Sequence, residues 1–135
     1  MKTIKINIVT PDGPVVETEA NMIIAVTETG EIGILPGHIA MVAPLQIGGL
    51  RLQKDDSMEQ IAVHGGFIEV RPDVVTVLAQ SAELASSIDI DRAKKAAKLA
   101  EETLQAKKEG REHELAALDL ERALNRINVY ETRKK

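Results

Sequence analysis

Three arginines, Arg92, Arg122 and Arg126, have the spacing in this sequence that points most directly to chemistry. Arg122 and Arg126 are four residues apart in a helical pattern, so they share one face. Folding this pattern back about Gly110 places Arg92 beside them. Guanidinium groups crowded at one end of a hairpin repel one another unless an anion or carboxylates lie between them. Two alternatives therefore stay open, an anion site or ordinary surface ion pairs worth about 0 to 1 kcal/mol each. The candidate carboxylates are Asp89, Asp91 and Glu121.

No arrangement of nucleophile and base is visible elsewhere in the sequence. The chain has no cysteine and no G-x-S-x-G motif, and its histidines lie in unrelated contexts. His38 and His64 lie beside turns, which favours structural hydrogen bonds over catalysis or metal binding, and His113 is expected on a solvated helix face. The glycine-rich segments do not have the spacing of a phosphate-binding loop. The sequence therefore predicts no catalytic residue and no metal site.

The composition excludes several classes of function. Phe67 and Tyr130 are the only aromatic residues, so the platforms that stack single-stranded nucleic acid are missing. Without cysteine there are no disulfides, which suits a reducing compartment. No signal-peptide pattern or transmembrane run is present. We expect no nucleic-acid partner, no direct membrane insertion and a chain that stays where it is made.

The first 85 residues have the pattern of short strands. Ile4, Ile6 and Ile8 alternate with polar residues, and the pattern stops at a Pro-Asp-Gly-Pro turn. Later apolar runs are separated by turn signals, one of them Gly48-Gly49. These runs cover residues 22–27, 33–35, 40–45, 58–63, 67–70 and 74–79. Strands at this spacing predict a β-sandwich or barrel over residues 1–85.

Residues 86–135 have the pattern of a helical hairpin. Ser86 and Asp89 resemble a capping box, which predicts a helix start near Ser87 or Ile88, and Gly110 can end that helix. Two antiparallel helices of about 20 residues are expected, each with an alanine-rich apolar stripe. The stripes are Ala93, Ala96, Ala97, Ala100 and Leu104, then Ala116, Leu120, Ala123, Leu124 and Ile127. Burying an alanine side chain stabilises a fold by roughly 2 kcal/mol less than burying a leucine side chain. The hairpin should therefore be the more mobile part.

Charge divides at the same boundary. Residues 1–85 contain 11 acidic and 5 basic residues, whereas the last 50 contain 10 acidic and 12 basic residues. This division suggests two parts that meet different surfaces, and solvated helix faces rich in lysine are an equal alternative.

Two segments carry a resemblance to a known family. The segments Gly30-Glu31-Ile32-Gly33-Ile34-Leu35-Pro36-Gly37-His38 and Val63-His64-Gly65-Gly66-Phe67-Ile68-Glu69-Val70 resemble the epsilon subunit of bacterial F-type ATP synthase, especially those of thermophilic bacilli. The likeness extends over essentially the whole chain. It implies a β-sandwich of about ten strands followed by a C-terminal antiparallel two-helix hairpin. It also implies a non-catalytic central-stalk subunit of the rotor, peripheral at the cytoplasmic face of the cell membrane.

The resemblance also implies partners. Glu31 matches a loop that faces the ring of c subunits, and His38 and Met41 match a segment that lies toward the gamma subunit. In the family the hairpin is folded against the sandwich in one state and extended along gamma in another. Basic residues of the extended hairpin then meet acidic segments of the beta subunits and oppose ATP hydrolysis. The candidates for this inhibitory contact are Arg111, Arg122 and Arg126.

Some family members bind ATP as a regulatory ligand through an Ile/Leu-Asp-x-x-Arg-Ala motif, which residues 88–93 match in full. The resemblance therefore favours the anion alternative and makes ATP the expected ligand, with accompaniment by Mg²⁺ left open. Leu99 stands where the bacillar pattern has arginine, which puts the affinity in question. The implied ATP-binding residues are Glu83, Ile88, Asp89, Arg92, Ala93, Arg122 and Arg126.

The expected function is a coupling and regulatory subunit that joins the catalytic head to the c ring and inhibits hydrolysis through its hairpin. The rival interpretation is a free-standing nucleotide-sensing or adaptor module with a mobile helical hairpin. An enzyme that acts alone is a distant third.

Overall fold

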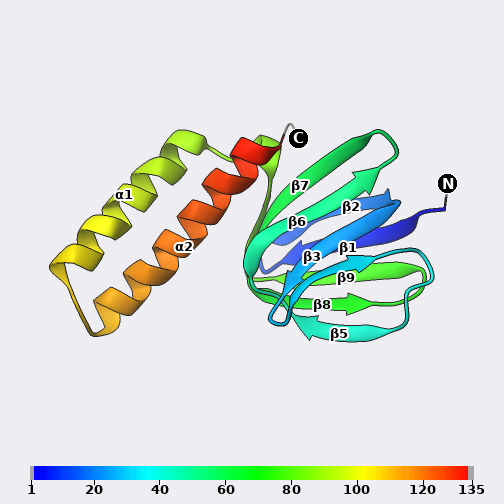
Figure 1. Cartoon of the computed structure of the whole chain (residues 1–135), viewed down its shortest axis with the longest axis horizontal. Coiled ribbons are helices and arrows are strands. Elements are labelled where there is room, and N and C mark those ends of the chain that lie inside the picture. Colours follow the sequence, from blue (N-terminus) through cyan, green and yellow to red (C-terminus); the bar gives the residue numbers. More distant parts are fainter. Residues whose placement is uncertain (1, 134–135) are drawn as a thin grey trace.

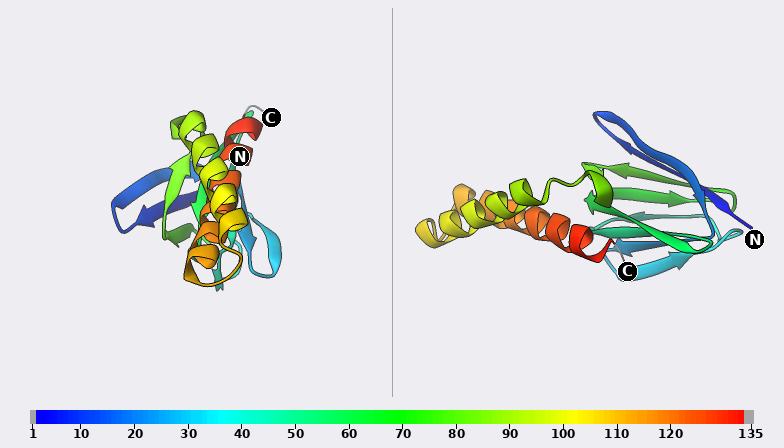
Figure 2. Two further views of the ribbon diagram at one scale, coloured as in Figure 1. Left: turned by 90° about the vertical axis from the view of Figure 1, so that its left-hand side faces the viewer. Right: turned by 90° about the horizontal axis from the view of Figure 1, so that it is seen from above.

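The computed structural model describes residues 2–133 and divides into two parts. Ten strands form a β-sandwich, and two antiparallel helices form a hairpin that lies at one side of it (Figure 1). The predicted fold class is therefore confirmed. Figure 2 shows the hairpin extending away from the sandwich, with helix α2 the nearer of the two helices. No helix within residues 2–133 combines the length and apolar character that crossing a membrane requires.

The first sheet has the strand order β2-β1-β9-β8-β5. All neighbouring pairs are antiparallel except β1 and β9, which run parallel from Lys5 opposite Val74 to Val9 opposite Leu78. The strands are β1 (Ile4–Thr10), β2 (Gly13–Ala20), β5 (Met41–Pro44), β8 (Gly66–Val70) and β9 (Val74–Ala79).

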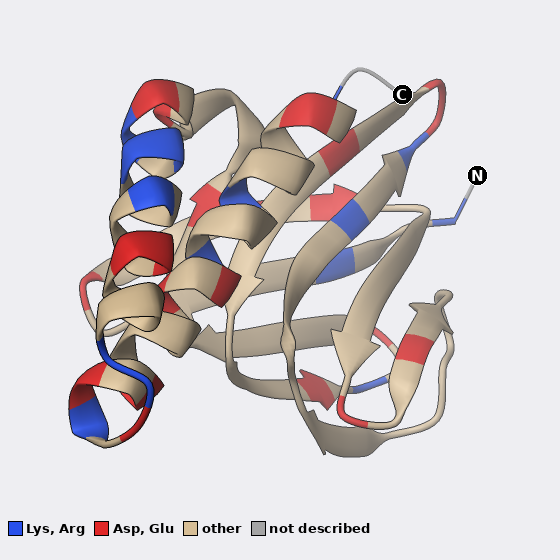
Figure 3. Cartoon of the chain, turned by 60° about the vertical axis from the view of Figure 1, so that its left-hand side comes forward, with Lys and Arg blue, Asp and Glu red and all other residues tan. Residues whose placement is uncertain are grey.

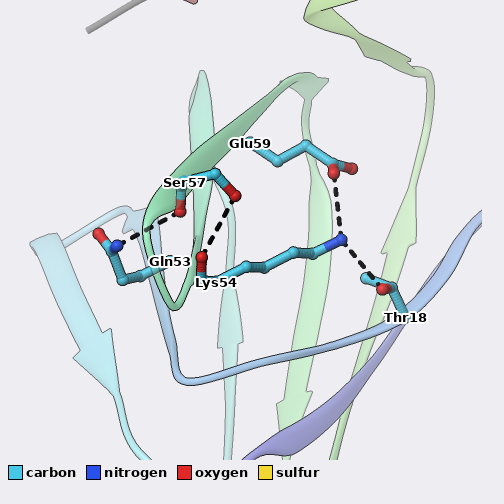
Figure 4. Close-up of polar contacts among 5 residues, drawn as sticks. All are labelled: Thr18, Gln53, Lys54, Ser57 and Glu59. Atoms are coloured by element: carbon cyan, nitrogen blue, oxygen red, sulfur yellow. Dashed lines mark hydrogen bonds and ion pairs between the residues drawn. The ribbon is translucent and has the colours of Figure 1, made fainter.

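The second sheet has the strand order β10-β7-β6-β3-β4, and every pair in it is antiparallel. Its strands are β3 (Met22–Thr27), β4 (Gly30–Ile34), β6 (Ile47–Lys54), β7 (Ser57–His64) and β10 (Ala82–Leu84). One polar cluster joins this sheet to the edge of the first. The Lys54 Nζ atom donates to Thr18 Oγ1 at 3.0 Å and to Glu59 Oε2 at 3.1 Å, near the turn between β6 and β7 that Gln53 and Ser57 flank (Figure 4).

The core follows from the period of two that strands impose. Ile4, Ile6 and Ile8 are at most 1 % exposed and face the second sheet's aliphatic residues. Strand β7 differs, because it is buried on both faces from Gln60 to His64. Its odd-numbered residues enter the sandwich core, while Ala62 packs on the outer side against the hairpin. Strand β7 therefore positions residues toward the junction of the two parts.

Three strands, β2, β6 and β10, are missing from the runs predicted from sequence. The prediction that Gly48-Gly49 turns the chain was wrong, since both glycines lie inside β6. A Cβ atom on Gly48 would lie 3.1 Å from Val26, and one on Gly49 would lie 3.1 Å from the Val129 Cγ2 atom. Gly48 makes room for a residue of β3, and Gly49 makes room for helix α2 on the outer face of the sheet.

The hairpin begins later than predicted. A 3₁₀ turn, η1 (Ala85–Ser87), occupies the expected start, and helix α1 (Ile90–Ala106) follows it. Asp89 caps α1, because its Oδ1 atom accepts from the Arg92 backbone N–H at 3.1 Å. Gly110 does not end α1; with φ at 90° it is the N-cap of α2 (Arg111–Thr132). At the start of α1, Asp89 rather than Ser86 is the cap, and its negative charge suits the free N–H groups and the dipole of the first turn.

The seam between the two helices is built from small residues. Ala93, Ala97 and Ala100 of α1 are buried, as are Ala116 and Ala123 of α2. Two members of the predicted stripes lie outside this seam: Ala96 is exposed, and Leu124 is 49 % exposed. Among the described residues α2 packs against both α1 and strands β6 and β7, whereas the main packing partner of α1 is α2, so Ala96 stays exposed on α1.

Candidate functional site

Helix α2 is held on the outer face of the second sheet by a few specific contacts. The Asn125 side chain donates to the Gly48 carbonyl at 3.0 Å. Near the end of α2, Gln60 donates to the Thr132 carbonyl at 2.7 Å and accepts from the Thr132 hydroxyl at 3.0 Å. Val129 is 1 % exposed and packs with Ala62 in a small apolar cluster. These contacts fix where the arginines of α2 lie relative to the sandwich.

A pocket of about 430 Å³ lies between the sandwich, the turn before α1 and both helices. Strand β10 supplies Glu83, the start of α1 supplies Asp89 and Arg92, and α2 supplies Arg126. The remaining lining residues are Ser87, Ala93 and Ala96. The fold therefore brings five of the seven predicted ATP-binding residues to one hollow, from three parts of the chain.

Arg126 and Glu83 form the ion pair of this pocket. The Arg126 Nε atom donates to Glu83 Oε1 at 2.5 Å, and the two side chains are 28 % and 35 % exposed. Sequence spacing suggested other carboxylates for the arginines. Among the described residues Arg126 pairs with none of them, because Glu83 reaches it from the neighbouring sheet.

The start of α1 contributes polar groups to the same pocket. Asp89 is committed to capping the helix, and Arg92 is exposed one turn further on. The free N–H groups and the helix dipole make a helix start favourable for anions. Glu83 and Asp89 oppose Arg92 and Arg126 in formal charge, so an anionic ligand would have to compete with carboxylates already present.

Two predicted ligand residues do not line this pocket. Ile88 is 6 % exposed, and its side chain packs with Ala62, Ala85 and Val129. Arg122 lines a second, neighbouring hollow of about 590 Å³, together with His64 of β7, Ile47 of β6 and residues of the connections between strands. Leu99 is 64 % exposed and lines a groove between the two helices, beside Ala96 and Arg126.

His64 is the residue of this region that sequence reasoning underrated. Its ring is 1 % exposed, and its Nδ1 atom lies 2.9 Å from Ser81 Oγ, which confirms the expected structural hydrogen bond. Its Nε2 atom is buried without a partner. Burial lowers the pKa of His64 to about 4, helped by the positive charges of Arg126 and Arg122 and opposed by Glu83. The imidazole is therefore neutral near pH 7.

Like His64, Arg122 has a buried polar atom without a partner. Its Nε atom is buried without a hydrogen-bond partner, and within residues 2–133 no carboxylate lies within ion-pair distance of it. The spacing of the arginines singled out Arg122 in the sequence. Nothing along the chain indicated that His64 lies near it, because the two residues are 58 positions apart.

Comparisons with known proteins match both parts of the chain. The family model described as ATP synthase, Delta/Epsilon chain, beta-sandwich domain covers residues 3–85, and that of the long alpha-helix domain covers residues 86–131. The chain belongs to the ATP synthase epsilon-chain family. It is 54 % identical over 129 residues to the ATP synthase epsilon chain of Bacillus velezensis, covering 96 % of this chain and 98 % of that one. It is 60 % identical over 107 residues to that of Anoxybacillus flavithermus, covering 79 % and 80 %.

Solved structures share the fold of this epsilon-family chain. A chain of the Euglena gracilis mitochondrial ATP synthase, in an assembly of OSCP, F1 and c-ring, superposes with a TM-score of 0.76 at 24 % identity, covering 88 % of this chain and 76 % of that chain. A chain from the central stalk and c-ring of the Tetrahymena thermophila enzyme gives 0.59 at 12 % identity, covering 99 % and 98 %.

The residues predicted to meet the gamma subunit and c ring lie far from the pocket in sequence and on other elements. Glu31 of β4 is 59 % exposed and pairs with Arg51 at 2.8 Å. His38 lies in the segment between β4 and β5, and its Nδ1 atom is 2.8 Å from the Ile39 carbonyl oxygen. Met41 begins β5 and packs partly against the sandwich core. Of the three, Glu31 is exposed but paired with Arg51, and Met41 is partly buried.

Exposed apolar residues lie between Leu35 and Val42 and on strands β8 and β9, and sequence reasoning did not single them out. Phe67 and Leu78, directly opposite each other on β8 and β9, are 57 % and 58 % exposed. Leu35, Ile39 and Val42 are between 56 % and 77 % exposed. Strand alternation could have indicated Val42, Phe67 and Leu78, which occupy outward positions of β5, β8 and β9, whereas Leu35 and Ile39 lie between strands.

The hairpin presents charge of both signs along its outer faces (Figure 3). Arg111, a candidate for the inhibitory contact, is the first residue of α2 and is exposed. It lies at the turn of the hairpin, whereas Arg122 and Arg126 are partly buried near the sandwich. The three inhibitory candidates are therefore not equally accessible while the hairpin is docked.

Proposed function

We propose that this chain is a non-catalytic rotor subunit of a proton-transporting F-type ATP synthase, at the cytoplasmic face of the membrane. In this role it couples the catalytic head to the c ring, inhibits ATP hydrolysis when its hairpin extends, and binds ATP as a conformational sensor. The observation that carries the sensor role is the pocket that Glu83, Asp89, Arg92 and Arg126 line together.

The pocket exists only while the hairpin is docked. Glu83 belongs to the sandwich, whereas Arg92 and Arg126 belong to different helices, so extension of the hairpin would separate them. A ligand that bridges these groups must prefer the docked state, and it can shift the equilibrium only by that preference. At 100 times its dissociation constant it stabilises that state by about 2.7 kcal/mol. This is comparable to burying one leucine, so ATP can decide the state of a hairpin with an alanine seam.

The gamma subunit and c ring are the proposed partners of the sandwich. Glu31 and His38, with the exposed apolar residues of β5, β8 and β9, supply one charged and one apolar surface for them. The beta subunits are the proposed partners of the extended hairpin, through Arg111, Arg122 and Arg126. Undocking would expose the last two, which are partly buried in the docked state.

Fluorescence transfer tests the sensor role. The chain contains no cysteine, so cysteines introduced at the exposed positions Asp56 and Lys108 report the distance from the sandwich to the hairpin turn. ATP should increase the docked population of the wild-type chain. Asp89→Ala and Arg92→Ala should weaken this response, whereas Lys95→Ala, which removes an exposed charge outside the pocket, should not. A wild-type chain that ignores millimolar ATP would end the sensor proposal.

Hydrolysis by a reconstituted complex tests the inhibitory role. Arg111→Ala removes a charge that does not line the nucleotide pocket, so a rise in hydrolysis would report loss of the contact with the beta subunits alone. Arg122→Ala and Arg126→Ala should raise hydrolysis further. Unchanged hydrolysis in all three variants, with assembly intact, would place the inhibition elsewhere.

A further inference from the structure

Two buried polar atoms without partners lie at the docked face of α2. These are His64 Nε2 and Arg122 Nε, and the two side chains line the same hollow of about 590 Å³. A buried polar group that lacks a hydrogen bond costs about 1 to 3 kcal/mol, and such groups are uncommon in native proteins. Two in one hollow indicate that the site is completed by something that bonds to both.

His64 is suited to meet either a donor or an acceptor. Its Nδ1 atom contacts Ser81 Oγ, and a hydroxyl group can donate or accept by rotating. When Ser81 donates to Nδ1, the proton of the neutral ring sits on Nε2, which then donates into the hollow. The same ring with the opposite tautomer accepts there. One rotation of a hydroxyl group therefore sets the hydrogen-bonding character of the buried atom.

An anionic oxygen is a group to which both orphan atoms can bond once the side chains that cover them part, since neither atom is accessible to solvent. It accepts from the Arg122 guanidinium and from Nε2–H of His64, and it offsets the positive potential of Arg122 and Arg126. The hollow's two carboxylates, Glu28 and Glu121, are exposed, so solvent screens them more than it screens the buried atoms. Arg122 and Arg126 are one helical turn apart, so this hollow continues the neighbouring pocket along α2.

We propose that His64 is a ligand-contacting residue that, with Arg122, binds a phosphoryl oxygen of the nucleotide, and that Ser81 sets its tautomer. This inference rests on the proposed ATP binding and adds a residue that contacts the phosphate chain. His64 therefore discriminates between nucleotides with long and short phosphate chains.

Calorimetric titration of the isolated chain with ATP and with AMP tests this. In His64→Leu the affinity for ATP should fall about tenfold, because a hydrogen bond to a charged group is lost, whereas the affinity for AMP should change less than twofold. His113→Leu, which alters a histidine near the hairpin turn, should leave both affinities unchanged. Equal affinities of His64→Leu and wild type for ATP would overturn the role of His64 and leave ATP binding intact. No ATP binding by the wild-type chain would overturn the proposed function itself.

A second measurement needs no variant. In the wild-type chain the ¹⁵N chemical shift of His64 Nε2 should change on addition of ATP, because Nε2–H then donates to a phosphoryl oxygen, while AMP should leave it in place. A ring whose shifts are the same with and without ATP would refute the contact, even where the Leu variant is too unstable to titrate.

Discussion

The sandwich and the hairpin differ in what holds them together. Inside the sandwich, isoleucine, valine and leucine residues from both sheets are almost fully buried. Between the sandwich and α2, the buried apolar cluster is small, with Ala62, Ala85, Ile88 and Val129 as its members. Each large aliphatic side chain contributes about 1.5 to 3 kcal/mol when buried. The sandwich therefore has a large apolar core of its own, whereas the hairpin is fastened to it by a much smaller apolar cluster.

The largest effect should come from the sandwich core. Leu52 of β6 is fully buried, so Leu52→Ala should lower the free energy of unfolding by about 2 to 5 kcal/mol. Urea denaturation followed by circular dichroism measures this loss. Leu99→Ala, at a leucine that is 64 % exposed, is the matched control and should change stability by less than about 0.5 kcal/mol. Similar losses in the two variants would contradict the contrast between the parts.

Substitution of Gly49 should undock the hairpin from the sandwich. Gly49→Val places a side chain where even a Cβ atom would be 3.1 Å from Val129, so the docked state should lose about 1 to 3 kcal/mol. Gly33→Val adds the same atoms in β4, where the nearest neighbour of the Cβ atom is Met22 Sδ at 4.0 Å. Fluorescence transfer should report an undocked hairpin in the first variant only. Sandwich melting should stay cooperative in both, and loss of sandwich folding in Gly49→Val would argue that docking and sandwich stability are inseparable.

Acid should weaken the docked state through His64. Its pKa of about 4 in the fold lies below its ordinary value of 6.5, so the unfolded chain binds more protons between these values. Stability contributed by the neutral ring is present above pH 6.5 and is lost as the pH falls toward 4, by about 1 kcal/mol at pH 5.5. The groups that face the ring are Arg122 and Arg126 of α2, Glu83 of β10, and Ser81. Urea titrations at pH 7 and 5.5 should show this loss in the wild type and a smaller one in His64→Gln.

The smallest effect is expected at the ion pair of the junction. Glu83→Gln removes the charge opposite Arg126 in a pair that is about one third exposed, so docking should weaken by about 0 to 1 kcal/mol without ATP. Glu69→Gln, in the more exposed pair with Arg71, is the control and should have no measurable effect. A loss above about 2 kcal/mol for Glu83→Gln would mean that the pair behaves as a buried one.

Local patterns in the sequence determined the division into sandwich and hairpin. The alternation of Ile4, Ile6 and Ile8 and the alanine stripe of α1 each encode the period of one element, and a period needs only near neighbours. The motif at residues 88–93, which the family resemblance supplied, contributes Asp89, Arg92 and Ala93 to the pocket at the start of α1, and ATP binding there stays a prediction. Because the strand pattern ends by Ala85 and the strands supply their own core, we expect residues 1–85 to fold alone, and truncation after Ala85 followed by thermal melting tests this.

Only the tertiary structure decided how the two parts meet. Gly48 and Gly49 read as a turn because glycine usually marks one, and their role in β6 became visible only once Val26 and Val129 lay against them. Glu83 and Arg126, 43 residues apart, pair because α2 crosses the second sheet. His64 and Arg122 share a hollow for the same reason. Such contacts depend on which face of a strand a helix covers, and the local periodicity of the sequence does not determine that face.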